Sequence, residues 1–235
     1  MAQEHTARAA IAGISSMAMR PILALLAARY ECETGRCVTI VSVGGVEASL
    51  RVRAGETFDF AVLASDAIER LAADGLVDPE SRVDVARSGV AVAVAVGATH
   101  PEIGSEAALR DAILRAGRIG ISTGPSGNAL LHLFERWGIA REMAARVVQA
   151  APGVPVGALI ANGEVELGFQ QLSELMTMPG VDIVGPLPPE IHAVTVFSGA
   201  ICATSRRRDE TLRFLAWLTS GEADAAKCEH GMEPA

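Results

Sequence analysis

Residues 119–132 read IGISTGPSGNALLH and place a strand, a loop and a helix in direct succession. Residues 119–121 are expected to end a short buried strand. Residues 122–128 are small, hydroxylated or glycine, and a helix is expected from Ala129 onward. A strand that leads through such a loop into a helix directs backbone N–H groups and the positive end of the helix dipole at one point. The stretch therefore predicts a turn that can bind an anion.

The same succession of strand, small-residue turn and helix recurs near the start of the chain. The expected strands are 9–14, 38–43 and 58–63. The expected helices are 17–30, a run that follows Gly45 and continues through Arg53, and 66–73. Three such units in succession predict an α/β fold with a mostly parallel sheet and right-handed crossovers.

Two long strands are expected outside these units. The run of alternating Val and Ala at 85–96 reads either as a buried central strand, the default, or as a strand that crosses between two lobes. Residues 192–203 are again strand-like and could provide the return crossing. The sequence thus leaves both a single sheet and a two-lobed protein open at this point.

The composition limits the classes of function. The net charge of −8 makes a nucleic-acid surface unlikely, but it does not exclude a small anion, because a pocket's field depends on a few local groups. The longest apolar run, 89–98, is too short to span a bilayer, so no membrane insertion is expected. The first ten residues contain no apolar targeting segment, which predicts a cytoplasmic location, or a periplasmic one if an export signal has been removed.

Metal and cofactor motifs are missing from the sequence. The cysteines, Cys32, Cys37, Cys202 and Cys228, form no CxxC pair, and no His lies at metal-ligand spacing from them. We expect free thiols, with a Cys32–Cys37 disulfide as the alternative for an exported protein. No dinucleotide fingerprint is present, so neither a cofactor nor a metal is expected.

Some polar residues at predicted strand ends have two interpretations. Ser15 and Ser16 could cap the next helix, which their sequence position favours, or donate hydrogen bonds to a ligand. Gln170 and Gln171 could be exposed loop residues or could orient a carboxylate, and the sequence favours neither.

The order of these features resembles the type 2 periplasmic binding proteins, and within them the molybdate-binding-like group. The segment ANGEVELGFQQLSEL at 161–175, followed by VDIVGPLP at 181–188, most resembles the branch that contains aconitate isomerase. The other matching landmarks are Ser15-Ser16, the turn at 42–45, AGETFDFAVLAS at 54–65, SRVDVARSGVAVAV at 81–94, the STGPSG loop at 122–127 and GMEP at 231–234.

This resemblance implies a two-lobed α/β protein with its ligand in the cleft between the lobes. Lobe I would comprise residues 1–85 and 199–235, and lobe II residues 86–198. The resemblance nominates as ligand-binding residues Ser15, Ser16, Ser42, Gly44 and Ser65 from lobe I, and Thr123, Ser126, Gly127, Gln171 and Ser173 from lobe II. Ordinary molybdate binders commonly have a Tyr where this chain has Gln171, so a carboxylate ligand is favoured over molybdate.

Three functions are compatible with these expectations, and we favour the first. It is a binding protein for a small oxyanion or organic carboxylate that supplies a transporter permease or acts as a sensor. The second is a cytosolic isomerase that moves a double bond in an unsaturated polycarboxylate, which requires a base beside the substrate. Glu174 and His132 lie near the proposed loops, but each is interpreted as structural, so no catalytic residue is assigned. The third is the ligand-sensing domain of a regulator, for which no helix-turn-helix segment is visible.

Overall fold

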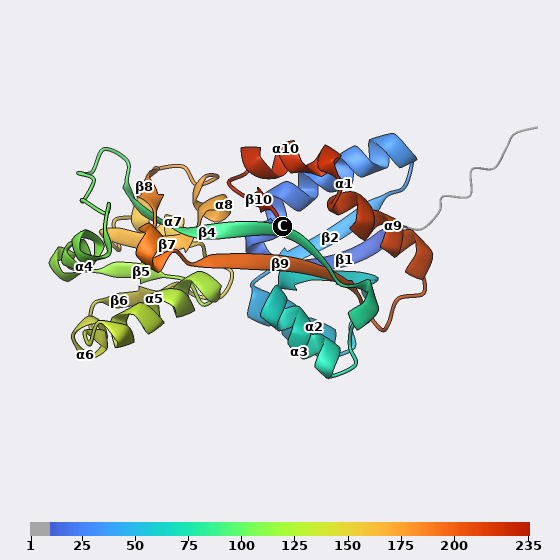
Figure 1. The fold of residues 1–235 in the computed structure, drawn as a ribbon, viewed down its shortest axis with the longest axis horizontal. Helices are drawn as coiled ribbons and strands as arrows, with labels where there is room; N and C mark the ends of the chain where they lie inside the picture. The colour runs from blue at the N-terminus through green and yellow to red at the C-terminus, as the bar shows by residue number, and fades with distance from the viewer. Residues whose placement is uncertain (1–9) are drawn as a thin grey trace, which may run out of the picture.

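Three strand–turn–helix units form the first half of lobe I, as the sequence predicts (Figure 1). The central strand pairs in parallel with one strand on each side. The strands are β1 (Ile11–Ser16), β2 (Val38–Val43) and β3 (Phe60–Ala64), and the helices are α1 (Arg20–Thr34), α2 (Gly45–Arg53) and α3 (Ser65–Ala73). A 3-10 helix, η1 (Met17–Met19), joins β1 to α1, and Pro21 lies in the first turn of α1, where its missing N–H costs no helical hydrogen bond.

The computed structural model describes residues 10–235, so the expectations for residues 1–9 lie outside it.

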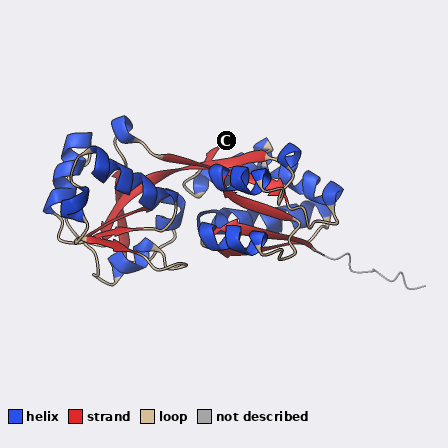
Figure 2. Ribbon diagram, turned by 90° about the horizontal axis from the view of Figure 1, so that it is seen from below, coloured by secondary structure: helices blue, strands red, loops and turns tan. Residues whose placement is uncertain are grey.

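Two long strands run side by side between the lobes (Figures 1 and 2). They are β4 (Val83–Ala95) and β9 (Val194–Ile201), and they pair with each other in antiparallel fashion. The first half of β4 pairs with β9, and the second half pairs with strands of lobe II. The strand predicted at 85–96 therefore crosses between the lobes, and it is also a largely buried strand in the interior of the strand order, so both interpretations describe it.

Lobe II repeats the layered α/β arrangement around its own strands. Its β5 lies between β7 and β6 and is parallel to both. The strands are β5 (Ile119–Ile121), β6 (Val147–Gln149), β7 (Leu167–Gln171) and β8 (Val181–Pro186). The helices are α4 (Glu106–Arg115), α5 (Pro125–Arg136), α6 (Ala140–Met143), α7 (Val156–Ala161), α8 (Leu172–Leu175) and the 3-10 helix η3 (Pro189–Ile191). The strand order β2-β1-β3-β9-β4-β7-β5-β6 gives a mixed sheet, because the crossing strands are antiparallel to their neighbours.

The C-terminal segment returns to lobe I. It consists of α9 (Arg208–Leu218), α10 (Gly221–Glu229) and β10 (Glu233–Pro234), and the 3-10 helix η2 (Pro79–Ser81) precedes β4. Strand β10 pairs with β4 at Ala86 and Arg87, which holds the chain end against the crossing strand. No helix within residues 10–235 combines the length and the apolar character that a membrane span requires.

Separate hydrophobic cores support the two lobes. Along β4, Val85 and Ala86 pack into a lobe I core with Phe60 and Phe214, whereas Val90 and the residues after it pack into the cores of lobe II. The predicted boundaries after residues 85 and 198 fall within the crossing strands themselves. We propose that the change of lobe in β4 lies between Ala86 and Val90.

Helix α5 begins at Pro125, four residues earlier than the sequence predicts. Pro125 fits a first helical turn because its φ is already close to the helical value. Gly127 allows this turn to close on the preceding strand, since a Cβ at that position would lie 1.9 Å from the carbonyl oxygen of Ser122. The loop therefore ends at Gly124, and what was expected to be its second half is the start of the helix.

Candidate functional site

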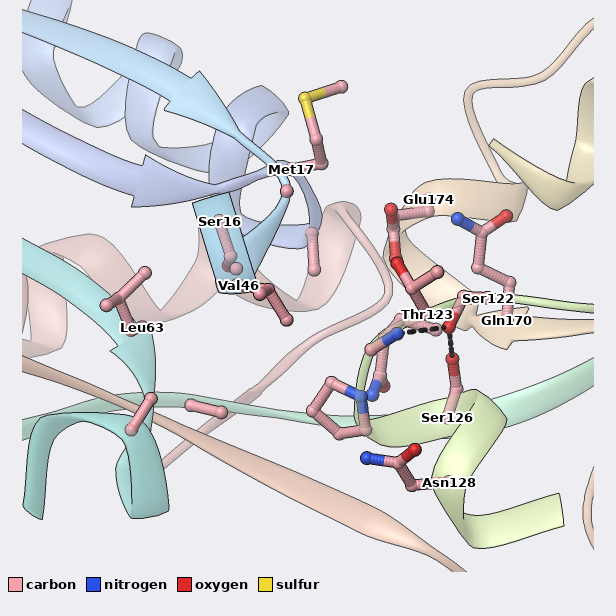
Figure 3. A pocket seen from close by; sticks show the side chains of 18 of the residues that line it. Ser16, Met17, Val46, Leu63, Ser122, Thr123, Ser126, Asn128, Gln170 and Glu174 are labelled. Atoms are coloured by element: carbon pink, nitrogen blue, oxygen red, sulfur yellow. Dashed lines mark hydrogen bonds between the residues drawn. The ribbon is translucent and has the colours of Figure 1, made fainter. Parts of the chain in front are cut away.

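A pocket of about 170 Å³ lies between the lobes and takes a wall from each (Figure 3). Lobe I contributes the turns that follow its three parallel strands, and lobe II contributes the start of α5, the turn before α7 and the end of β7. The lining residues in lobe I fall within 16–18, 44–49 and 63–70, and those in lobe II within 122–128, 151–154 and 170–174, with Phe197 from β9. All of these turns lie at carboxyl ends of strands or at helix starts, where ligands of α/β proteins usually bind.

Ser16 supplies the buried polar group of the lobe I wall. It is the last residue of β1, and its hydroxyl has no hydrogen-bond partner among the described residues. Buried hydroxyls without partners are rare in folded proteins, so this one is available to a ligand. Ser15 and Ser42 lie behind the pocket and hydrogen-bond each other, with 2.8 Å between their Oγ atoms. Ser16 occupies the N-cap position of η1, as predicted, but neither Ser15 nor Ser16 makes a capping hydrogen bond with its side chain.

Ser122 organises the lobe II wall, and sequence reasoning missed it. Its Oγ accepts hydrogen bonds from the N–H groups of Gly124 (3.1 Å) and Gly127 (3.3 Å) and lies 2.8 Å from the Oγ of Ser126 (Figure 3). Because both lone pairs of Ser122 Oγ are used, its own proton goes to Ser126. The proton of the Ser126 hydroxyl is then free for a ligand. The loop thus satisfies two of its own N–H groups through Ser122, instead of presenting them all to an anion.

Two glutamines at the end of β7 are both 2% exposed, so the interpretation of them as exposed loop residues was wrong. The side chain of Gln170 accepts the N–H of Val156 at 2.8 Å. Gln171 donates to the hydroxyl of Thr195 at 2.7 Å, and its carbonyl oxygen has no partner among the described residues. The Thr195 hydroxyl can donate a hydrogen bond as well as accept one. If the Gln171 amide were flipped, its oxygen would accept from Thr195 and its NH₂ group would face the pocket in place of the oxygen. Gln171 can therefore hydrogen-bond either a donor group or an acceptor group of a ligand.

Glu174 brings a carboxyl group into this wall, although the sequence suggested only a structural role for it. Its side chain faces the gap between Met17 of lobe I and the Thr123 loop (Figure 3). Burial raises the pKa of the Glu174 carboxyl to about 7, and the neighbouring Gln170 side chain opposes that rise in part. At neutral pH this group is therefore close to half protonated, so it can take up or give a proton.

Charge elsewhere in the pocket is balanced. Arg70 and Asp66 are the other charged side chains that line it, and they form an ion pair of 2.9 Å on α3. Within residues 10–235, no group of three or more His, Cys, Asp or Glu side chains is arranged to hold a metal ion. Cys32 and Cys37 are both free thiols in the structure. The pocket therefore offers neutral hydrogen-bonding groups, the Asp66–Arg70 ion pair and the Glu174 carboxyl.

The nominated residues divide into two groups. Those that line the pocket are Ser16, Gly44, Thr123, Ser126 and Gln171, and those outside its lining are Ser15, Ser42, Ser65, Gly127 and Ser173. Ser173 instead donates a hydrogen bond to the carbonyl oxygen of Ala18 at 3.2 Å, which ties α8 to lobe I. His132 is exposed on α5 and is not a lining residue. Ser122, Glu174, Arg70 and Asn128 line the pocket without having been nominated.

The outer rim of the pocket brings the lobes close together. A Cβ added to Gly44 would lie 4.0 Å from the backbone nitrogen of Gly153 in the opposite lobe. Val46 and Val154, which flank these glycines, line the pocket and are 61% and 41% exposed. Two exposed apolar side chains on facing rims are suited to contact each other when the lobes move together.

Two α/β lobes, two crossing strands and a pocket between the lobes define a periplasmic-binding-protein fold. Residues 11–233 match the model of the bacterial extracellular solute-binding protein family, and the chain belongs to this family. Its pocket lies between the two lobes.

Three comparisons with known proteins agree with this assignment. The chain is 34% identical over 215 residues to an aconitate isomerase from Pseudomonas sp., covering 89% of this chain and 82% of the relative. Its fold matches the Azotobacter vinelandii periplasmic molybdate-binding protein with a TM-score of 0.79 at 20% identity, over 94% and 98% of the two chains. It also matches the substrate-binding domain of a putative molybdenum ABC transporter from Clostridium difficile, with a TM-score of 0.73 at 13% identity, over 96% and 98%.

Proposed function

We propose that the anion bound in the cleft is a small organic polycarboxylate. The observation that carries this proposal is the mixed lining of the pocket. Hydroxyl and amide groups of Ser16, Ser126 and Gln171 can bind carboxylates, and apolar side chains such as Met17, Val46 and Leu63 can cover a carbon skeleton. A tetrahedral metal oxyanion has no apolar surface to place against those side chains, whereas a carbon acid does.

A comparison of ligands tests this proposal directly. Tricarballylate, a saturated tricarboxylate, should raise the melting temperature and give saturable heats by calorimetry, because a ligand that binds only the folded state stabilises it. At a concentration of 100 Kd the expected stabilisation is about 2.7 kcal/mol. Molybdate serves as the comparison ligand. Stabilisation by molybdate without any by tricarballylate would overturn the proposal.

We also propose that the bound carboxylate is passed to a transporter permease outside the cytoplasm. Membership of a family described as extracellular supports the periplasmic alternative over the cytoplasmic one. Immunodetection in periplasmic and cytoplasmic fractions of the producing cells would test it. Recovery only with cytoplasmic markers would contradict it.

A second candidate function is isomerisation of an unsaturated polycarboxylate. It is favoured by the 34% identical relative named aconitate isomerase and by the carboxyl group in the pocket wall. Moving a double bond by one carbon requires removal of a proton beside a carboxylate and its return elsewhere. In D2O, interconversion of cis- and trans-aconitate with deuterium uptake, followed by NMR, would establish this activity. Saturable binding without exchange would leave a binding protein.

A further inference from the structure

We propose that Glu174 is the acid–base catalyst of an allylic proton exchange in this pocket. The inference rests on the second candidate function and assigns the residue that would perform it. Three features support the assignment: the residues that line the pocket, the burial and the polar neighbour of the carboxyl group, and the hydrogen-bond donors in the same pocket.

Glu174 is the one titratable lining residue that is not held in an ion pair. Among the described residues around the pocket, the charged side chains are Asp66, Arg70 and Glu174, and none is His, Cys, Lys or Tyr. Asp66 is paired with Arg70, and both side chains of the pair are 63% exposed. The Asp66 carboxylate is thus already neutralised by a partner and lies largely in solvent. A proton removed from a ligand in this cleft therefore has Glu174 as its acceptor.

Gln170 is the polar neighbour that acts on the Glu174 carboxyl group. The Gln170 Oε1 atom accepts the N–H of Val156 at 2.8 Å, so the Gln170 amide is oriented by the start of α7. The Gln170 side chain lowers the pKa of Glu174, against the larger effect of burial. A polar neighbour whose own rotamer is fixed gives the carboxyl group a constant environment. The half-protonated state near neutral pH, caused by burial, suits a group that must both remove and return a proton.

The donors needed for the charge that develops on the ligand are also present. The start of α5 and the Ser126 hydroxyl lie on the same lobe as Glu174, and the partnerless Ser16 hydroxyl lies on the opposite lobe. Such neutral donors can stabilise an enolate-like carboxylate without neutralising the base by an ion pair. The pocket thus combines one base with several oxyanion donors.

The reaction step is a proton shift that needs no other reactant. The Glu174 carboxylate removes a proton from the methylene carbon between a carboxylate and the double bond, so a C–H bond breaks and an O–H bond forms. The electron pair is delocalised over the three-carbon unit and the adjacent carboxylate. The protonated Glu174 then returns the proton to the far carbon of that unit. A new C–H bond forms, the double bond has moved, and the Glu174 carboxylate is regenerated.

The experiment compares Glu174→Gln with the wild-type chain and with Glu135→Gln, which removes an exposed carboxylate from α5 outside the pocket. Each protein is incubated with trans-aconitate in D2O and followed by NMR, and tricarballylate binding is measured in parallel. We expect Glu174→Gln to lose interconversion and deuterium uptake by about 100-fold or more. We also expect it to bind tricarballylate at least as tightly as the wild type. Glu135→Gln should match the wild type in both assays.

The outcomes separate the two proposals. Undiminished exchange by Glu174→Gln would overturn the assignment of Glu174. Tricarballylate binding by the wild type without any exchange would also overturn it, while leaving the polycarboxylate-binding function intact. No tricarballylate binding by the wild type would overturn the binding function itself. Retained binding by Glu174→Gln shows that the variant is folded, so lost exchange would then support the assignment.

Discussion

The backbone of Gly127 passes directly over the carbonyl oxygen of Ser122, where a Cβ would lie only 1.9 Å from that oxygen. No side-chain rotation can relieve this contact, because it is made by the backbone. Gly127→Ala should therefore shift the first turn of α5 and lower the free energy of unfolding by about 1–3 kcal/mol, the usual cost of forcing an extra carbon into a packed site. Urea denaturation measures this change.

Gly124→Ala is the matched control for that substitution. At Gly124 the nearest atom to an added Cβ is Ser122 Oγ at 3.6 Å, which is ordinary contact, and its φ of −96° suits any residue. We expect its effect on stability to stay within about 0.5 kcal/mol. Equal losses for the two variants would show that the loop lacks the close approach at Gly127.

The double substitution of Ser126 and Gln171 tests the lobe II wall. Both side chains line the pocket, and each has hydrogen-bonding capacity that the described residues leave free or can release. Ser126→Ala together with Gln171→Ala should abolish the melting shift caused by tricarballylate, since each lost bond to a charged group is worth about 1.5–3 kcal/mol. The melting temperature without ligand provides the folding control. A full ligand-induced shift in the double variant would place the site elsewhere.

Local sequence signals were sufficient for much of the fold. Short apolar or β-branched runs between turn residues predicted both bounds of β2 and the end of β5 at Ile121 to the residue. The start of α5 was predicted four residues too late. A Gly-Pro pair such as Gly124-Pro125 usually indicates a loop, but proline is equally suited to the first turn of a helix. The family resemblance supplied the two-lobed arrangement that periodicity left open.

The candidate site was harder to predict, because it depends on contacts between distant segments. Ser42 was nominated by the family resemblance, but the register of β1 and β2 sets Ser15 opposite Ser42 and pairs the two hydroxyls. Glu174 was interpreted as structural, because its burial results from the packing of α8 against the crossing strand β4 and against lobe I, where Ser173 bonds Ala18. Neither the strand register nor this packing can be read from local patterns.

Ser42→Ala should separate stability from binding. The Ser42 hydroxyl bonds the fully buried Ser15 hydroxyl and does not line the pocket between the lobes. Loss of one such hydrogen bond should lower the free energy of unfolding by about 1 kcal/mol. The tricarballylate dissociation constant should not change. A large loss of affinity, measured by calorimetry, would show that Ser42 contacts the ligand after all.

The raised pKa of Glu174 makes a prediction about stability as a function of pH. Burial favours the protonated carboxyl, and its pKa is raised from 4.5 to about 7 in the folded chain. Below pH 4.5 the group is protonated in both the folded and unfolded states, so burial has no ionisation cost. Between about pH 4.5 and 7 the folded state holds more protons than the unfolded state, so stability falls as the pH rises. Above about pH 7 the full cost, on the order of 3 kcal/mol, is present.

Glu174→Gln removes this ionisation while keeping the size and polarity of the side chain. The variant should therefore be more stable than the wild type at pH 8, by about 1–3 kcal/mol, and close to it at pH 4.5. Urea denaturation of both proteins at the two pH values measures the difference, and Glu135→Gln, on the exposed face of α5, controls for a general change in charge. A difference of the same size at both pH values would mean that the Glu174 carboxyl keeps its ordinary pKa. It would then be ionised and solvated at neutral pH, and it would be a poor base for a bound carbon acid.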